Sequence, residues 1–175
     1  MDLFKTISKR YSYRGGFKNK KIPKKDLKKI VQAGLDAPSG KNEQTTTFVI
    51  IDDKKFMKKI STMHAMKAMQ EAKAMIVCIV DKRPQPVYEG FSFQIEDCSA
   101  AAENMLLAIT ALGYASVWID GWLKLEERAE KIGKILNLPK GKVVRVLLPM
   151  GEPSQYLPRK QKKSFKERAW FNKHM

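Results

Sequence analysis

One stretch of the chain is apolar at nearly every position. Between Ser99 and Leu112 most residues are Ala, Leu, Ile or Met, and Glu103, Asn104 and Thr110 are the polar interruptions. A helix of this composition is apolar around most of its circumference, so it is expected to be buried on all sides. It is too short to cross a bilayer, which takes about 20 apolar residues. The pattern predicts a central helix held in a two-layer core or at a subunit interface, and we favour the interface.

The rest of the hydrophobic pattern predicts interleaved helices and strands. Apolar residues recur at helical spacing in residues 2–10, 23–35, 54–70 and 125–136. Shorter apolar or alternating runs predict strands at residues 48–51, 75–80, 115–119 and 143–148. Several connections are too short for parallel crossovers, so we expect an α+β fold in which helices flank a mixed or antiparallel sheet.

The length of the chain allows one domain with a substantial core. Of its 175 residues 43% are hydrophobic, and no linker divides them. Residues 1–175 are therefore expected to form a single domain with a basic C-terminal tail from about residue 152. The start of the chain is a short amphipathic segment rather than a signal sequence, so we expect a cytoplasmic protein. Cys78 and Cys98 have no CxxC spacing, and with two histidines in the chain we expect reduced thiols and no metal site.

Positive charge is concentrated at the two ends of the chain. The net charge is +16; residues 1–30 carry 11 Lys or Arg against 2 Asp or Glu, and residues 159–175 carry 7 against 1. Basic ends favour a polyanion, a phosphorylated ligand or merely solubility. A nucleic-acid-binding protein is therefore an alternative, although no helix-turn-helix, zinc-finger or RNP pattern accompanies the charge.

A short basic segment near the start has the chemistry of a phosphate site. In the run R-Y-S-Y-R the alternate residues Arg10, Ser12 and Arg14 share one face if the segment is extended. Guanidinium groups bind phosphate oxygens bidentately and stay charged when partly buried, so this face suits a phosphate and a polyol. Taken alone, the segment fits solvated strand residues better. No GxGxxG motif occurs, so a Rossmann dinucleotide site is not predicted.

Five motifs follow one another along nearly the whole chain. They are R-Y-S-Y-R at 10–14, A-P-S-G-K-N-E-Q at 37–44 with the following F-V-I-I, the central run 97–121, L-N-L-P-K-G-K-V-V-R-V-L-L-P-M-G-E-P at 136–153, and the basic tail. In this order and spacing they resemble the FMN-dependent nitroreductase family. The resemblance implies an α+β fold and an intertwined homodimer, with the central helix at the interface and two FMN sites that each draw on both subunits.

The resemblance also implies roles for individual residues around FMN. The FMN phosphate, ribityl chain and pyrimidine edge correspond to the segment Arg10, Tyr11, Ser12 and Arg14. The loop that reaches the flavin from the other subunit corresponds to Pro38, Ser39, Gly40 and Asn42. The segment whose backbone faces the isoalloxazine near N5 corresponds to Trp118, Ile119, Asp120 and Gly121. The tail cations that close on the phosphate correspond to Lys160 and Lys162.

Three parts of the chain depart from the family pattern. Residues 45–47 are three threonines where many relatives have Pro-Trp, so the wall beside the flavin is expected to differ. Where relatives place an Asn and a Lys against the pyrimidine ring, the matching stretch offers Lys67. The segment before the central helix is short, and its Tyr88, Phe91 and Phe93 are either a lid over the substrate or ordinary loop packing.

The resemblance implies an FMN-dependent NAD(P)H oxidoreductase in which no side chain has to act as an acid. NADH or NADPH would reduce the flavin at N5 and leave, and a nitroaromatic or quinone acceptor would then take the hydride in a ping-pong cycle. Positive charge from Arg14, with Lys67, would stabilise the reduced flavin. A protein that binds or stores FMN without turnover is the alternative on the same fold.

Overall fold

A sheet of four antiparallel strands forms the centre of the protein. The computed structural model describes residues 2–174, and its strands are β1 (Thr47–Ile51), β2 (Ala74–Asp81), β3 (Ala115–Ser116) and β4 (Lys142–Gly151). Their order in the sheet is β1-β2-β4-β3, and each neighbouring pair is antiparallel. The two central strands are buried along most of their length, as continuous apolar runs require. The prediction of an α+β fold is confirmed, with the antiparallel form of the sheet.

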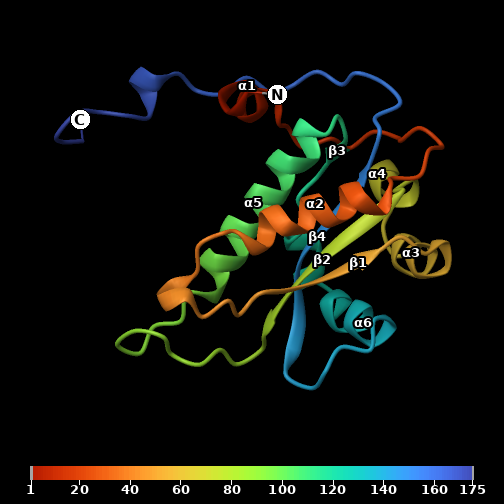
Figure 1. Cartoon of the computed structure of the whole chain (residues 1–175), viewed down its shortest axis with the longest axis horizontal. Coiled ribbons are helices and arrows are strands. Elements are labelled where there is room, and N and C mark those ends of the chain that lie inside the picture. Colours follow the sequence, from red (N-terminus) through yellow and green to blue (C-terminus); the bar gives the residue numbers. More distant parts are fainter. Residues whose placement is uncertain (1, 175) are drawn as a thin grey trace.

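Helices cover both faces of this sheet (Figure 1). The helices α2 (Lys24–Leu35) and α5 (Gln94–Ala111) pack on one face. The other face carries α3 (Lys54–Ser61), α4 (Lys67–Gln70) and α6 (Arg128–Ile135). The short helix α1 (Leu3–Lys9) packs on α5, and three 3-10 turns complete the fold, η1 (Gly40–Asn42), η2 (Gly121–Lys124) and η3 (Phe165–Glu167).

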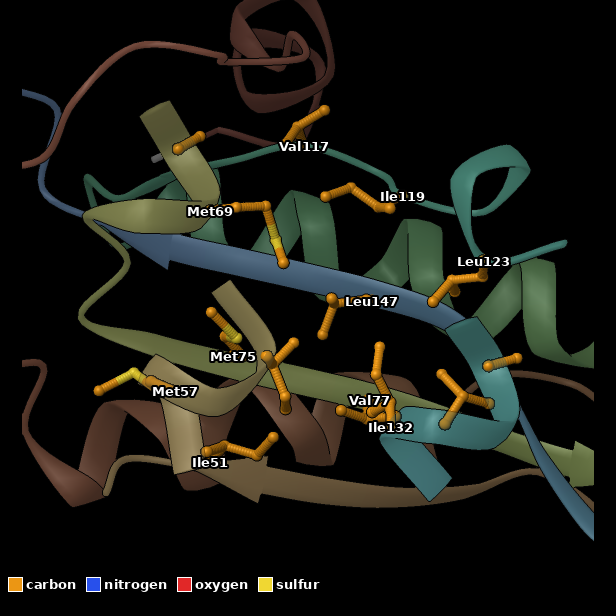
Figure 2. Packing of buried hydrophobic residues seen from close by; sticks show 14 of the residues in the cluster. Ile51, Met57, Met69, Met75, Val77, Val117, Ile119, Leu123, Ile132 and Leu147 are labelled. Atoms are coloured by element: carbon orange, nitrogen blue, oxygen red, sulfur yellow. The ribbon is translucent and has the colours of Figure 1, made fainter. Parts of the chain in front are cut away.

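Alternation along β2 divides the buried side chains into two clusters. Met75 and Val77 face α3, α4 and α6, whereas Ile76 and Cys78 face α2 and α5. Figure 2 shows the first cluster, where Leu147 of β4 lies among side chains from the helices and from β2. Each fully buried aliphatic side chain of this size contributes about 1.5–3 kcal/mol relative to an exposed one. Packing on both faces therefore stabilises the sheet. At its β3 edge the sheet is contacted by the segment that contains Ser12.

The central helix ends where the sequence predicts. Gly113 adopts a left-handed conformation (φ 85°), its N–H donates to the Thr110 carbonyl (3.1 Å), and the Tyr114 N–H donates to the Ile109 carbonyl (3.0 Å). These two bonds form a Schellman cap, which needs a residue that tolerates positive φ. Among residues 2–174 no helix combines the length and the apolar character needed to span a membrane.

Within one chain, α5 is not buried on all sides, contrary to what its composition predicted. One side of the helix, which includes Ala102 and Met105, is fully buried against the sheet. The opposite side, which includes Glu103 and Ala111, is exposed, and Ile95 near its start is 40% exposed. Within one chain the helix is therefore buried on one side only, although its outer side is also largely apolar.

Two predicted helices are shorter in the structure. The predicted helix 54–70 is split into α3 and α4, because His64 Nδ1 accepts the Met66 N–H (3.0 Å) and Met66 is extended. The predicted helix 125–136 begins only at Arg128, because Glu126 and Glu127 adopt left-handed conformations (φ 53° and 56°). In both places the hydrophobic spacing was helical, but local hydrogen bonding and backbone conformation broke the helix.

Candidate functional site

The basic segment 10–14 is extended, and it presents alternate residues to solvent as predicted. Tyr13 is fully buried, and its hydroxyl donates to the Gly16 carbonyl (2.6 Å), whereas Ser12 and Arg14 are exposed. The Tyr13 N–H donates to the Ser116 carbonyl of β3 (2.8 Å), and Ser12 pairs in parallel with the same residue. The buried tyrosine and the β3 pairing thus fix which side chains point outward.

Arg10 is oriented by a carboxylate on the central helix. Its Nε lies 3.1 Å from Oε1 of Glu103 on the exposed side of α5, and the two side chains are 22% and 48% exposed. A pair this open to water contributes about 0–1 kcal/mol to stability. The contact therefore has little weight in folding, but it holds the guanidinium at the junction of the basic segment and α5.

The C-terminal tail returns to the basic segment. The Gly16 carbonyl accepts hydrogen bonds from the N–H and hydroxyl of Ser154 (3.0 and 2.8 Å), which fixes the start of the tail. Further on, Arg159 Nη1 donates to the Ser8 carbonyl (2.5 Å), and its guanidinium lies 4.9 Å from the Tyr11 ring centroid. Burial raises the pKa of the Tyr11 hydroxyl, a shift that the Arg159 charge opposes in part.

One cation of the tail, Arg159, therefore lies at the N-terminal segment. The predicted tail cations Lys160 and Lys162 are exposed and follow it one and three residues later, and their role at the phosphate stays a prediction. Sequence reasoning missed Arg159 itself, although its position just before two predicted tail cations in a basic run was a usable signal.

Residues 118–121 begin two positions after Ser116, the β3 residue that pairs with the basic segment. The predicted strand 115–119 is limited to two residues in β3, and Ile119 instead forms an isolated bridge in which its N–H and carbonyl pair with Leu147 (3.1 and 2.9 Å). At Gly121 a side chain would meet no atom within 4 Å. Gly121 is exposed, and its N–H has no hydrogen-bond acceptor among residues 2–174.

Asp120 is held by two cations. Its Oδ1 lies 2.7 Å from Arg145 Nη1 and 3.3 Å from Lys124 Nζ. Burial raises the pKa of the Asp120 carboxyl, but the hydrogen bond and charge of Arg145, with those of Lys124, outweigh it and hold the pKa below its ordinary value. Sequence reasoning missed Arg145, which is the single charged residue in the apolar run from Val143 to Met150.

Lys67 lies beside the segment that carries the predicted phosphate residues. Its Nζ is 3.7 Å from Glu71 Oε1, and Glu71 Oε2 accepts the Phe17 N–H (3.1 Å). A Cβ added at Gly16 would lie 2.8 Å from Lys67 Cε, so the lysine stem lies against the backbone two residues beyond Arg14. Lys67 thus lies near the end of the basic segment, and its role toward the pyrimidine ring stays a prediction.

The loop 38–42 contacts α5 closer to the N-terminal end of the helix than Arg10 does. The Gly40 N–H donates to Asp97 Oδ1 (2.9 Å), six residues before Glu103, which is about 9 Å along a helix. Figure 1 shows α1 toward the C-terminal end of α5 and this orange loop toward its N-terminal end. The structure therefore does not bring Pro38, Ser39, Gly40 and Asn42 to the basic segment of the same chain.

The candidate lid is a tight hairpin that contacts this loop. Val87 and Phe91 N–H groups donate to the Phe91 and Tyr88 carbonyls (both 2.7 Å), across a turn with positive φ at residues 89 and 90. Lys41 Nζ lies 5.1 Å from the centroid of the Tyr88 ring, and a Cβ added at Gly40 would lie 2.8 Å from the Phe93 ring. Tyr88 and Phe93 thus contact the loop, whereas Phe91 is 65% exposed, so the three aromatic side chains do not form one surface.

A cavity lies behind the same loop, at the place where residues 45–47 depart from the family pattern. It has a volume of about 370 Å³ and is bounded by α2, by residues 37–48 and by α5. The buried hydroxyls of Thr45 and Thr46 have no hydrogen-bond partner in the described chain. No group of three or more metal-ligating side chains occurs among residues 2–174.

Comparisons with known proteins show the family of the chain. A family model described as the nitroreductase family matches residues 7–75 and 61–152. A protein of Archaeoglobus fulgidus, named as an NADH dehydrogenase/NAD(P)H nitroreductase, is 34% identical over 154 residues, which cover 87% of this chain and 86% of that protein.

Solved structures show the same fold. One from Bacteroides thetaiotaomicron, named as an NADH dehydrogenase/NAD(P)H nitroreductase, has a TM-score of 0.82 and 28% identity, covering 97% of this chain and 96% of that one. An FMN-dependent nitroreductase of Clostridium difficile has a TM-score of 0.80 and 28% identity, covering 97% and 98%. With a family model spanning most of the sequence and a relative above 30% identity, this chain belongs to the nitroreductase family.

Proposed function

We propose that this protein is an FMN-dependent NAD(P)H oxidoreductase that passes a hydride from NADH or NADPH to a nitroaromatic or quinone acceptor by a ping-pong cycle. Membership in the nitroreductase family supports the oxidoreductase class, and the FMN-dependent relative of Clostridium difficile supports the cofactor. The observation that carries the proposal is the exposure of Ser12 and Arg14 on the segment that buried Tyr13 fixes beside Ser116, two residues before the segment 118–121.

The residues present fit FMN at this edge of the sheet. Arg10, Ser12 and Arg14 would offer two guanidinium groups and a hydroxyl to the phosphate, and Arg159 lies close by, against Ser8 and Tyr11. Several converging cations stabilise a phosphate dianion, even where each exposed pair is worth little. At Gly121 the open space and the free N–H allow a flat ring system to approach the backbone.

The chemistry divides between the cofactor and the chain. FMN, when bound, supplies hydride acceptance and donation at N5. The chain binds the phosphate through the 10–14 segment, and the Gly121 N–H is available to orient the ring. Positive charge from Arg14 favours negative charge on the pyrimidine edge, and Lys67, which is paired with Glu71, would add less. Asp120 is already paired with Arg145, so it adds little net negative charge to the site.

The same site is proposed to be completed by a second copy of the chain. Several large apolar side chains are uncovered in one chain: Leu3 (59% exposed), Phe4 (77%) and Ile7 (49%) on α1, Ile95 (40%) on α5, and Phe165 (65%) and Phe171 (83%) in the tail. Exposed apolar surface on this scale marks an interface. The loop 38–42 lies apart from the cations of its own chain, so a partner's loop would be needed to bring the two together.

The test is the visible spectrum of the purified protein under anaerobic conditions. We expect flavin absorbance that NADH or NADPH bleaches and that a nitroarene or benzoquinone restores, with parallel double-reciprocal plots for the two substrates. Protein that retains no flavin after purification in the presence of FMN would contradict the proposal. Flavin that binds but is not bleached by either nicotinamide would instead identify an FMN-storage protein.

A further inference from the structure

An extra residue interrupts the pairing of the two central strands. Cys78 of β2 is opposite Val146 of β4, but the next residue, Ile79, is opposite Val144, so Arg145 has no partner in the ladder. A bulge of this kind kinks the strand and re-aims one side chain. Here it allows a charged residue to leave a strand whose other side chains, such as Val144 and Leu147, are buried in the core.

The released side chain reaches the segment beside the candidate flavin site. Arg145 Nη1 lies 2.7 Å from Asp120 Oδ1, and the two side chains are only 21% and 22% exposed. An ion pair that is largely shielded from water is stronger and less screened than a surface pair. Lys124 Nζ also contacts Asp120, at 3.3 Å, but its side chain is 63% exposed.

Two attachments therefore tie the same short segment to β4. Ile119 is joined to Leu147 by a pair of backbone hydrogen bonds, and Asp120 is joined by its carboxylate to the bulged residue two positions earlier. The next residue, Gly121, is exposed, and its N–H has no hydrogen-bond acceptor among residues 2–174. Both attachments lie just before the peptide between Asp120 and Gly121, so β4 restrains this peptide from its N-terminal side.

We propose that Arg145 is a positioning residue for the flavin reaction: it holds the Asp120 carboxylate, fixes the direction of the Gly121 N–H and neutralises a negative charge beside the isoalloxazine ring. The inference rests on the proposed function, because it needs the ring to lie at Gly121. A flavin gains negative charge on reduction, so an uncompensated carboxylate nearby would make reduction less favourable.

The test measures the midpoint potential of bound FMN by anaerobic titration. In Arg145→Met we expect a more negative potential and weaker FMN binding than in wild type. Asp120→Asn should move the potential the opposite way, because it leaves the guanidinium without a counter-charge. The double variant Asp120→Asn/Arg145→Met should lie between the single variants. Lys142→Met is the matched control, because it removes a 3.0 Å ion pair between another cation of β4 and Asp81, and neither residue belongs to the segment 118–121.

The outcomes separate this inference from the proposed function. A wild-type protein that binds no FMN would refute the proposed function whatever the variants do. If wild type binds FMN but Arg145→Met and Asp120→Asn leave the midpoint potential of the bound FMN unchanged, the positioning role is refuted. If Arg145→Met and Lys142→Met then lose the same unfolding free energy, the Arg145–Asp120 pair is structural only. Should Arg145→Met fail to fold, the positive shift in Asp120→Asn alone still decides, and an unchanged potential there overturns the inference.

Discussion

Replacing Arg10 with alanine tests whether the basic segment binds the FMN phosphate. The pair between Arg10 and Glu103 is 22% and 48% exposed, so its loss should cost at most about 1 kcal/mol of folding stability. A charge-assisted hydrogen bond to a phosphate contributes about 1.5–3 kcal/mol to binding, so its loss should raise the dissociation constant of FMN roughly 10- to 150-fold. The two magnitudes differ enough that Arg10→Ala should lose FMN affinity while the fold stays intact.

The assay is titration of flavin-free protein with FMN, followed by calorimetry or flavin fluorescence. The matched control is Lys9→Ala, since Lys9 is an exposed cation on the last turn of α1 and lies outside the proposed site. The dissociation constant of Lys9→Ala for FMN should lie within about twofold of that of wild type, because this change removes one positive charge but no contact with the cofactor. Arg10→Ala binding FMN as tightly as this control would refute the assignment of the phosphate to residues 10–14.

Three further predictions concern assembly and stability. Phe4→Asp should convert a dimer into monomers in analytical ultracentrifugation, because Phe4 is 77% exposed in one chain, and a stable dimer would exclude α1 from the interface. Burial and the hydrogen bond to Asp26 of α2 raise the pKa of Tyr114 to about 12. The contribution of this tyrosine to the unfolding free energy is therefore present below pH 10 and is lost as the pH rises toward 12. In Tyr114→Phe the unfolding free energy should fall less steeply over that range. Gly151→Ala should cost about 1–3 kcal/mol in urea unfolding, because the added Cβ would lie 2.7 Å from the Phe17 ring, whereas Gly133→Ala, with 3.5 Å of clearance, should be neutral or stabilising.

Much of the fold could be predicted because the hydrophobic period matches the structure. The buried strand β2 and the capped end of α5 at Gly113 follow directly from a continuous apolar run and a glycine. The break between α3 and α4 could not be predicted, because it depends on a hydrogen bond from the Met66 N–H to the His64 ring. Side-chain contacts of this kind leave the spacing of apolar residues unchanged.

The candidate site was predicted in part for a similar reason. Alternation in residues 10–14 identified Arg10, Ser12 and Arg14, and the structure confirms that Ser12 and Arg14 point outward. Glu103, Arg145 and Arg159 were missed as partners, because each acts through a contact between residues far apart in the sequence. Two signals in the sequence marked such contacts: the single charge of Arg145 within an apolar run, and the position of Arg159 in the basic run of the tail.

The Gly16 carbonyl has a consequence for how the ends of the chain move. It accepts hydrogen bonds from Tyr13 and from Ser154, so one oxygen joins the proposed phosphate-binding segment to the start of the tail. A displacement of Ser154 would break two hydrogen bonds to the backbone that follows Arg14. We therefore expect the position of the start of the tail and the conformation of the basic segment to be coupled through Gly16.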